Sequence, residues 1–177
     1  MLHFETVEQL HAESDPRRFW HLAILIGLRD KAERVEVRFG EDGTALLYHR
    51  VAGRDWEIAP ISPELFPELK PTLRQVARLV APERPEGQIT FGIPDARLEP
   101  QEIGWLTYQL QGHLFDLTVR IDPREPYGSI TLGIEHSEEQ EAAGLAAEVL
   151  ADYYSSDPSE SAISSDAPES EISPNFL

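Results

Sequence analysis

The amino-acid sequence predicts an α+β fold, with an antiparallel sheet of meander and hairpin strands and helices that lie apart from those strands along the chain. Three observations predict it. Residues 34–39 alternate strictly between polar and apolar side chains, as a half-buried strand does. Short turns, such as Gln111-Gly112, separate neighbouring strand patterns. Helical patterns lie before, between and after the runs of strands instead of alternating with single strands, which argues against a parallel βαβ sheet.

Two helices are predicted at the front of the chain. Thr6-Val7-Glu8-Gln9 forms a capping box that opens a short helix ending near Ser14. Asp15 is the expected N-cap of a second helix, with Pro16 at its first position. This N-terminal helix is apolar around most of its circumference, so we expect it to be a central core element. Its apolar positions are Phe19, Trp20, Ala23, Ile24, Ile26, Gly27 and Leu28.

Strands dominate the middle of the chain. After 34–39, Gly-containing turns lead to strands at 44–51 and 56–58, which completes a meander. Ser62-Pro63 begins a helical turn, and because Pro67 and Pro71 interrupt the next residues, the middle helix is expected to run from Pro71 to Val80. Four more strands are predicted at 88–93, 105–110, 114–121 and 129–134. Trp20, Trp56 and Trp105 lie in three different elements, and core packing is the expectation for each.

A C-terminal helix and a tail complete the prediction. Ser137 and Gln140 form a capping box, and apolar residues four apart predict an acidic helix over 138–153. Residues 155–177 consist mainly of Ser, Pro and acids, a composition that predicts a disordered tail behind a single domain of residues 1–154. This tail has two interpretations. It is either a solubilising extension or a leash whose apolar end, with Phe176 and Leu177, is a docking motif.

Charge and composition exclude several classes of protein. The chain has 177 residues, 15 Lys and Arg, 32 Asp and Glu and a formal charge of −17, which argues against nucleic-acid binding. Residues 135–177 hold eleven acids and no Lys or Arg, so much of this charge belongs to one end. The absence of cysteine excludes disulfides and thiolate metal sites. Without a signal-peptide pattern at the start or an apolar run long enough for membrane insertion, the expected location is cytoplasmic.

Motifs for catalysis are absent from the sequence. There is no P-loop, no GxGxxG, no GxSxG and no HExxH. Among the six histidines, His49 suits a core or an exposed strand position, and His113 a solvated one. We therefore expect no enzyme activity, no catalytic residues, no cofactor and no metal site.

The order of strands and turns resembles a known family. Four segments carry the likeness, namely Ala32-Glu33-Arg34-Val35-Glu36-Val37, Arg50-Val51-Ala52-Gly53, Pro85-Glu86-Gly87-Gln88-Ile89 and Asp116-Leu117-Thr118-Val119-Arg120 with the following Pro123 and Tyr127-Gly128-Ser129. Over about 17–135 they resemble the domain that precedes the P-loop ATPase domain in type II secretion and type IV pilus assembly ATPases.

The likeness implies a degenerate, stand-alone relative. Glu36 replaces the His of the family's first motif, Ala52 replaces the Asp of the second and Ser129 replaces the final Glu. Thr118 aligns with the family's strand Arg, which helps contact nucleotide phosphates, and the 177 residues contain no P-loop ATPase domain.

Arg50, Arg120 and Arg124 are candidates for a vestigial anion patch, because Arg120 shares a strand face with Thr118. The alternative is that these arginines pair with the abundant acids.

Two functions are expected from these observations. The first is a non-catalytic protein-interaction module, an accessory or regulatory partner of type II secretion or type IV pilus machinery. The alternative is an acidic secretion-chaperone-like protein that holds an effector segment as a homodimer. For both functions we expect a protein partner and no binding of nucleic acid, and we expect the chain itself to be a monomer or a homodimer.

Overall fold

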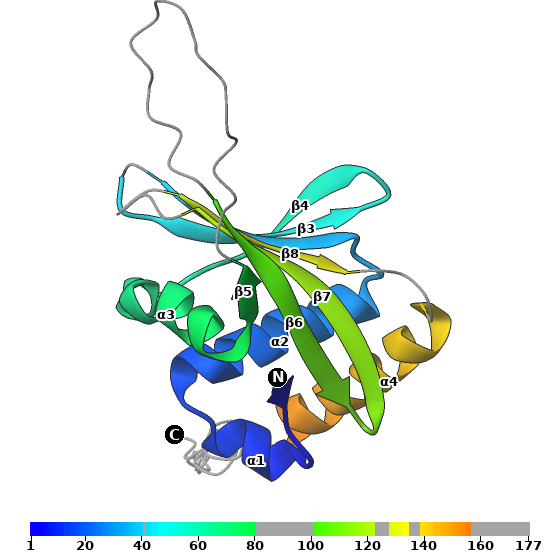
Figure 1. Ribbon diagram of the computed structural model, residues 1–177. Helices are drawn as coiled ribbons and strands as arrows, with labels where there is room; N and C mark the ends of the chain where they lie inside the picture. Colours follow the sequence, from blue (N-terminus) through cyan, green and yellow to red (C-terminus); the bar gives the residue numbers. More distant parts are fainter. Residues whose placement is uncertain (41, 81–100, 123–127, 135–138, 157–177) are drawn as a thin grey trace, which may run out of the picture.

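A computed structural model describes residues 1–40, 42–80, 101–122, 128–134 and 139–156. It confirms the α+β class: helices lie against one large, mostly antiparallel sheet (Figure 1). No helix in these ranges is long and apolar enough to cross a membrane. In chain order the elements are β1 (Leu2–His3), α1 (Val7–Ala12), α2 (Asp15–Arg29), β2 (Arg34–Phe39), β3 (Ala45–Val51), β4 (Arg54–Pro60), η1 (Pro63–Leu65), α3 (Phe66–Val76), β5 (Arg78–Val80), β6 (Glu102–Leu110), β7 (His113–Ile121), β8 (Ser129–Ile134) and α4 (Glu139–Ser155).

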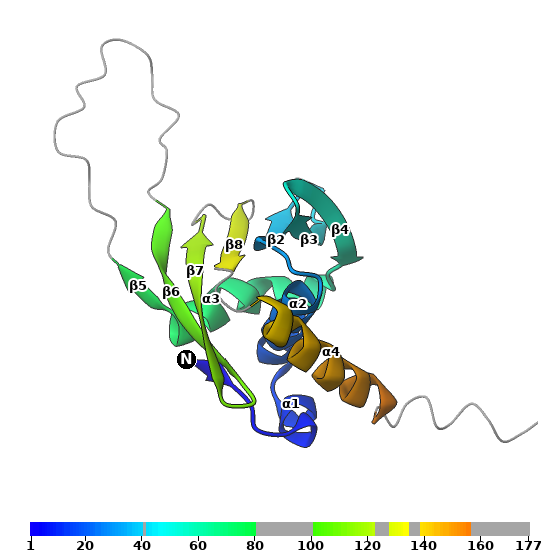
Figure 2. The ribbon, with the colours of Figure 1, turned by 90° about the vertical axis from the view of Figure 1, so that its right-hand side faces the viewer.

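Two antiparallel meanders make up the sheet. Its strand order is β1-β6-β7-β8-β2-β3-β4, and β5 also pairs with β6. The first meander, β2-β3-β4, joins the second, β6-β7-β8, where β2 pairs with β8 and places Val35 opposite Leu132. Only β1 runs parallel to its neighbour among the described strands. Figure 2 shows the sheet curving over the helices.

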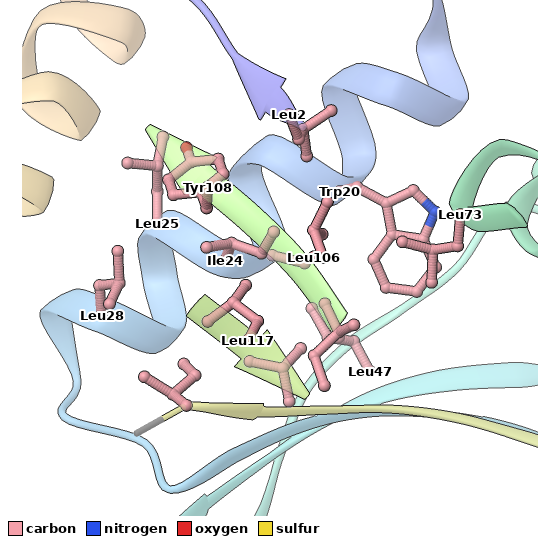
Figure 3. Packing of buried hydrophobic residues seen from close by; sticks show 14 of the residues in the cluster. Leu2, Trp20, Ile24, Leu25, Leu28, Leu47, Leu73, Leu106, Tyr108 and Leu117 are labelled. Atoms are coloured by element: carbon pink, nitrogen blue, oxygen red, sulfur yellow. The ribbon is translucent and has the colours of Figure 1, made fainter. Parts of the chain in front are cut away.

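Helix α2 lies at the centre of the core, as the sequence predicts. Trp20, Ile24 and Leu25 are buried, and Figure 3 shows Ile24 pointing toward Leu106 and Leu117 of the sheet. The indole nitrogen of Trp20 donates to the carbonyl of Leu69 at 3.1 Å, which ties α2 to α3. Gly27 lets α2 approach the sheet closely, because a Cβ there would lie 2.6 Å from a methyl carbon of Val35.

The middle helix differs from its prediction. We expected residues 71–80, but α3 spans Phe66–Val76, Pro71 lies inside it, and residues 78–80 form β5. Pro67 lies in the first turn, where a missing N–H costs nothing, so Pro71 removes only one helical hydrogen bond. Leu69 and Leu73, four residues apart on one face, are both buried. Their packing offsets the loss at Pro71.

The ends of the helices differ in detail from the predicted ends. Thr6 caps α1 by accepting from the amide of Gln9 at 3.3 Å, and the Gln9 side chain accepts from the amide of Glu5 instead of that of Thr6. At α2, Ser14 is the N-cap, and Asp15, the predicted cap, is the first helical residue. Helix α4 ends at Ser155, two residues beyond the expected end, so Ser155 is not part of a tail.

The predicted strands that lie within the described residues are confirmed, and several are longer than expected. The third strand covers residues 54–60 instead of 56–58, and β6 begins three residues before its expected start. The short strands β1 and β5 were not predicted. The predicted strand 88–93, the Ser137 cap and residues 157–177 lie outside the described residues.

Candidate functional site

The sheet has one face turned toward the helices and an opposite face that the described helices leave uncovered (Figures 1 and 2). Alternation along each strand decides which side chains reach this outer face. On β6, Leu106, Tyr108 and Leu110 point into the core and are fully buried, whereas their neighbours on the outer face are half-buried or exposed. This outer face is the candidate site.

An ion-pair cluster occupies the part of this face formed by β2, β3 and β4. The Arg38 guanidinium donates to Glu36 at 2.9 Å and to Asp55 at 2.7 Å, and it lies 4.2 Å from the ring centre of Tyr48. The Arg38 hydrogen bond is the main reason why the pKa of Asp55 is lowered. Arg34 also approaches Glu36, at 3.3 Å. The cations of this cluster are therefore matched by acids of the same chain.

A polar hollow of about 390 Å³ lies beside that cluster, across β7, β8 and β2. Gly133 makes room for it, because a Cβ there would collide with the hydroxyl of Thr118. The lining residues are Glu33, Arg34, Gln101, Thr118, Arg120, Asp122, Ser129, Thr131 and Gly133. Two carboxylates and two guanidiniums in one hollow leave no net charge for a strong anion site.

Two of the three arginines of the expected anion patch lie within the described residues, and only one of these two lines the hollow. Arg120 lines it together with Thr118, as their shared strand face predicts. Arg50 is not among its lining residues and instead lies near Glu33, at 3.8 Å, and Asp55, at 3.7 Å. Arg124 lies outside the described residues. Arg34 is the arginine that accompanies Arg120, and no pattern in the sequence singled it out.

An apolar patch covers the outer face at the other end of the sheet. We define the outer apolar patch as Val80, Ile103 and Trp105, whose exposed fractions are 47%, 45% and 50%. Cross-strand register holds them together, since Val80 of β5 lies opposite Ile103 of β6. The patch borders a hollow of about 380 Å³ lined by Met1, Val76, Arg78, Val80, Trp105, Thr107 and Asp116.

This patch corrects the expectation that all three tryptophans pack in the core. Trp20 is 1% exposed, but Trp56 is 54% and Trp105 is 50% exposed. The signal was present in the sequence of β6, where Leu106, Tyr108 and Leu110 form one face, and Trp105 alternates with Thr107 and Gln109 on the other. Trp105 therefore lies on the polar face of its strand.

Two histidines are buried on the helix side of the sheet. His49 lies 3.6 Å from Asp30, and burial lowers its pKa although the Asp30 carboxylate opposes the shift. Burial also lowers the pKa of His21, to about 3. His113 is half-buried, 3.6 Å from Glu141 of α4. No group of three or more His, Asp or Glu side chains in the described ranges is placed to hold a metal ion.

The proposed docking motif at Phe176 and Leu177 lies outside the described residues. No model of a known protein family matches the chain, and a search of curated proteins finds no match either. The candidate site therefore rests on the geometry of the outer face.

Proposed function

We propose that the chain is a non-catalytic protein-interaction module and that its outer sheet face contacts the partner. The observation that carries this proposal is the outer apolar patch. Val80, Ile103 and Trp105 are large, adjacent and about half exposed, although most apolar residues of the neighbouring strands β7 and β8 are buried on the helix side. Grouped exposed apolar side chains rimmed by charges are typical of protein-binding surfaces.

The proposal extends to the partner: a component of type II secretion or type IV pilus machinery, for which the chain is an accessory or regulatory protein. Support comes from the resemblance in sequence and from where its altered positions lie. Thr118 and Ser129, which replace the family's Arg and Glu, both line the polar hollow, and Glu36 lies in the neighbouring ion-pair cluster. Substitutions at all three positions suit a face that contacts protein in place of nucleotide.

A secretion-chaperone-like role is the second candidate, and the edge strand β4 favours it. This strand is the last in the sheet, and most of its residues are exposed, including Trp56. An extended segment of another protein can add to such an edge through main-chain hydrogen bonds. This role predicts a secreted protein as the partner and a homodimer in solution.

Two tryptophans of nearly equal exposure allow a matched test. Tagged full-length chain, Trp105→Ala and Trp56→Ala are used to capture proteins from cells that contain the intact secretion or pilus machinery, and the captured proteins are identified by mass spectrometry. We expect a machinery component with the wild type and Trp56→Ala, and its loss with Trp105→Ala. Thermal unfolding of each variant checks that both remain folded.

The other outcomes separate the candidates. A secreted protein that is lost only with Trp56→Ala, together with a dimer mass by light scattering, supports the chaperone-like role. Equal capture by all three proteins would show that neither tryptophan contacts the partner and would contradict both proposals. Turnover of a substrate by the purified chain would refute the non-catalytic role.

A further inference from the structure

We propose that the outer apolar patch, together with Arg78 and Arg120 beside it, binds the C-terminal segment of the same chain, residues 157–177. The site would then be occupied from within the molecule, and a partner would compete with this segment. The regulatory consequence rests on the proposed function, whereas the docking itself does not. Four observations carry the inference, namely the charge of the patch, the chemistry of the segment, its length, and the acidity of the hollow nearest to its start.

Two arginines lie beside the patch on the outer face. Register places Arg78 directly opposite Trp105, and Arg120 directly opposite Ile103. Neither arginine forms an ion pair within the described residues, in contrast to Arg34, Arg38 and Arg50 on the same face. Asp116, which lines a hollow together with Arg78, accepts a hydrogen bond from the Thr107 hydroxyl at 2.8 Å, and Arg120 shares the polar hollow with Glu33 and Asp122. An acidic ligand with apolar side chains is the chemical complement of this surface.

Residues 157–177 have that chemistry. The segment contains five acids and no Lys, Arg or His, and its apolar residues are spaced between the acids. An acid can approach each arginine while an isoleucine or the terminal Phe176-Leu177 covers the indole of Trp105. The acids are Asp157, Glu160, Asp166, Glu169 and Glu171, and the large apolar residues are Ile163, Ile172, Phe176 and Leu177.

The segment is long enough to reach the patch. It begins after Ser156, which lines a hollow together with Gln111 of the β6–β7 hairpin. Trp105 precedes Gln111 by six residues, or about 20 Å at strand spacing, and the width of the hollow adds to this path. The 21 residues of 157–177 span up to about 70 Å when extended. Attachment to the same molecule also gives the segment an effective concentration on the order of millimolar.

The hollow nearest to the start of the segment is a poor alternative. It measures about 460 Å³, and its lining includes Glu5, Glu8 and Asp152 without a basic residue. Like charges repel the acids of 157–177 there. The polar hollow on the outer face, which Arg120 borders, contains two carboxylates, and none of the residues that line it is a large apolar one. The patch beside Arg78 and Arg120 is the part of this surface where the charge and apolar character both match the segment.

The absence of cysteine provides a direct test with the full chain. Ser173→Cys introduces a single thiol for a nitroxide spin label, and the label broadens the amide NMR signals of residues close to it. We expect broadening at Arg78, Ile103 and Trp105 and none at Asp55 and Glu57 on the opposite edge strand β4. Raising the salt from 0.1 to 1 M shortens the Debye length from about 10 to 3 Å and should weaken the broadening.

Charge reversal supplies the matched control. In the labelled chain, Arg78→Glu together with Arg120→Glu should abolish the broadening at Trp105. Arg54→Glu should leave it unchanged, because Arg54 is an exposed arginine of β4 that also lacks an ion pair within the described residues. Uniform or absent broadening at low salt would overturn the proposal, as would broadening that survives the double reversal. Broadening that grows with protein concentration would show docking between copies and would also overturn it.

The same variants keep this inference separate from the proposed function. The label measures docking without any partner present. If docking occurs but no partner is captured, the proposed function fails and the inference stands. If the partner is captured through Trp105 while the label reports no contact, the inference fails and the proposed function stands. If both hold, Phe176→Ala should increase partner capture, and unchanged capture would refute competition.

Discussion

Acidification should destabilise this protein through the buried side chain of His21. The ring lies inside the core, 5.0 Å from the ring of Phe4 in an edge contact and with Nδ1 3.5 Å from the Tyr108 hydroxyl. Its Nε2 is buried and has no hydrogen-bond partner among the described residues. Burial lowers the pKa of His21 to about 3, and the charges of Arg17 and His3 add to this effect. Burial raises the pKa of Tyr108, which therefore stays neutral.

The sign and size of the effect depend on proton binding. In the unfolded chain a histidine binds a proton near its ordinary pKa of about 6.5, whereas folded His21 binds one only near pH 3. Between these values the unfolded state holds more protons, so the free energy of unfolding falls as the pH falls. The slope is about 1.4 kcal/mol per pH unit for one group, or about 3 kcal/mol between pH 6 and 4.

Urea unfolding of the wild type and His21→Phe from pH 7 to 4 measures this contribution. Groups common to both proteins, including His49 and the carboxylates, cancel in the difference between their free energies of unfolding. That difference should shift by about 1.4 kcal/mol per pH unit below pH 6 in favour of the variant. His113→Gln is the control for removing a histidine that lies outside the core. A difference between wild type and His21→Phe that stays constant over this range would refute the reasoning.

Three further outcomes are expected. Ile24→Ala empties a fully buried site and should lower the free energy of unfolding by about 2–5 kcal/mol in urea titrations, whereas a loss below about 0.5 kcal/mol would show that the core lies elsewhere. Gly27→Ala should destabilise the fold by about 1–3 kcal/mol, because the overpacking against Val35 is only partly offset by the better helix propensity of alanine. Gly144→Ala is the control: its Cβ meets nothing within 4 Å, so it should be neutral or stabilising by up to about 1 kcal/mol. Purified chain should not hydrolyse ATP, because the sequence lacks a P-loop; turnover above a blank, abolished by a point substitution in the chain, would contradict this.

Local patterns predicted the elements that carry their own signals. Strand β2 alternates over its whole length, and the apolar circumference of α2 identifies a helix packed on several sides. Both signals arise from neighbours along the chain, so tertiary structure adds little to them. The same holds for β8, whose predicted and observed limits agree.

Elements that depend on distant contacts could not be predicted in this way. Strand β1 has two residues and exists because Leu2 pairs beside Tyr108, and β5 has three residues that pair with β6. Helix α3 continues through Pro71 because Leu69 and Leu73 are buried in a core contributed by other elements. The pairing of β2 with β8 joins residues about a hundred positions apart, and no local pattern encodes it.

The candidate site illustrates a different limit. Alternation along β6 separates Trp105 from Leu106, but it does not say which of the two faces the helices cover. The size of the Trp105 side chain favours a buried position, whereas the polar residues on the same face of the strand favour an exposed one. In the structure Trp105 lies on the outer face with the polar residues, because Leu106, Tyr108 and Leu110 occupy the core side of the strand and leave no room there for an indole. An exposed Trp105 beside two arginines is therefore a consequence of strand register, and its energetic cost in water is the physical reason to expect that something binds there.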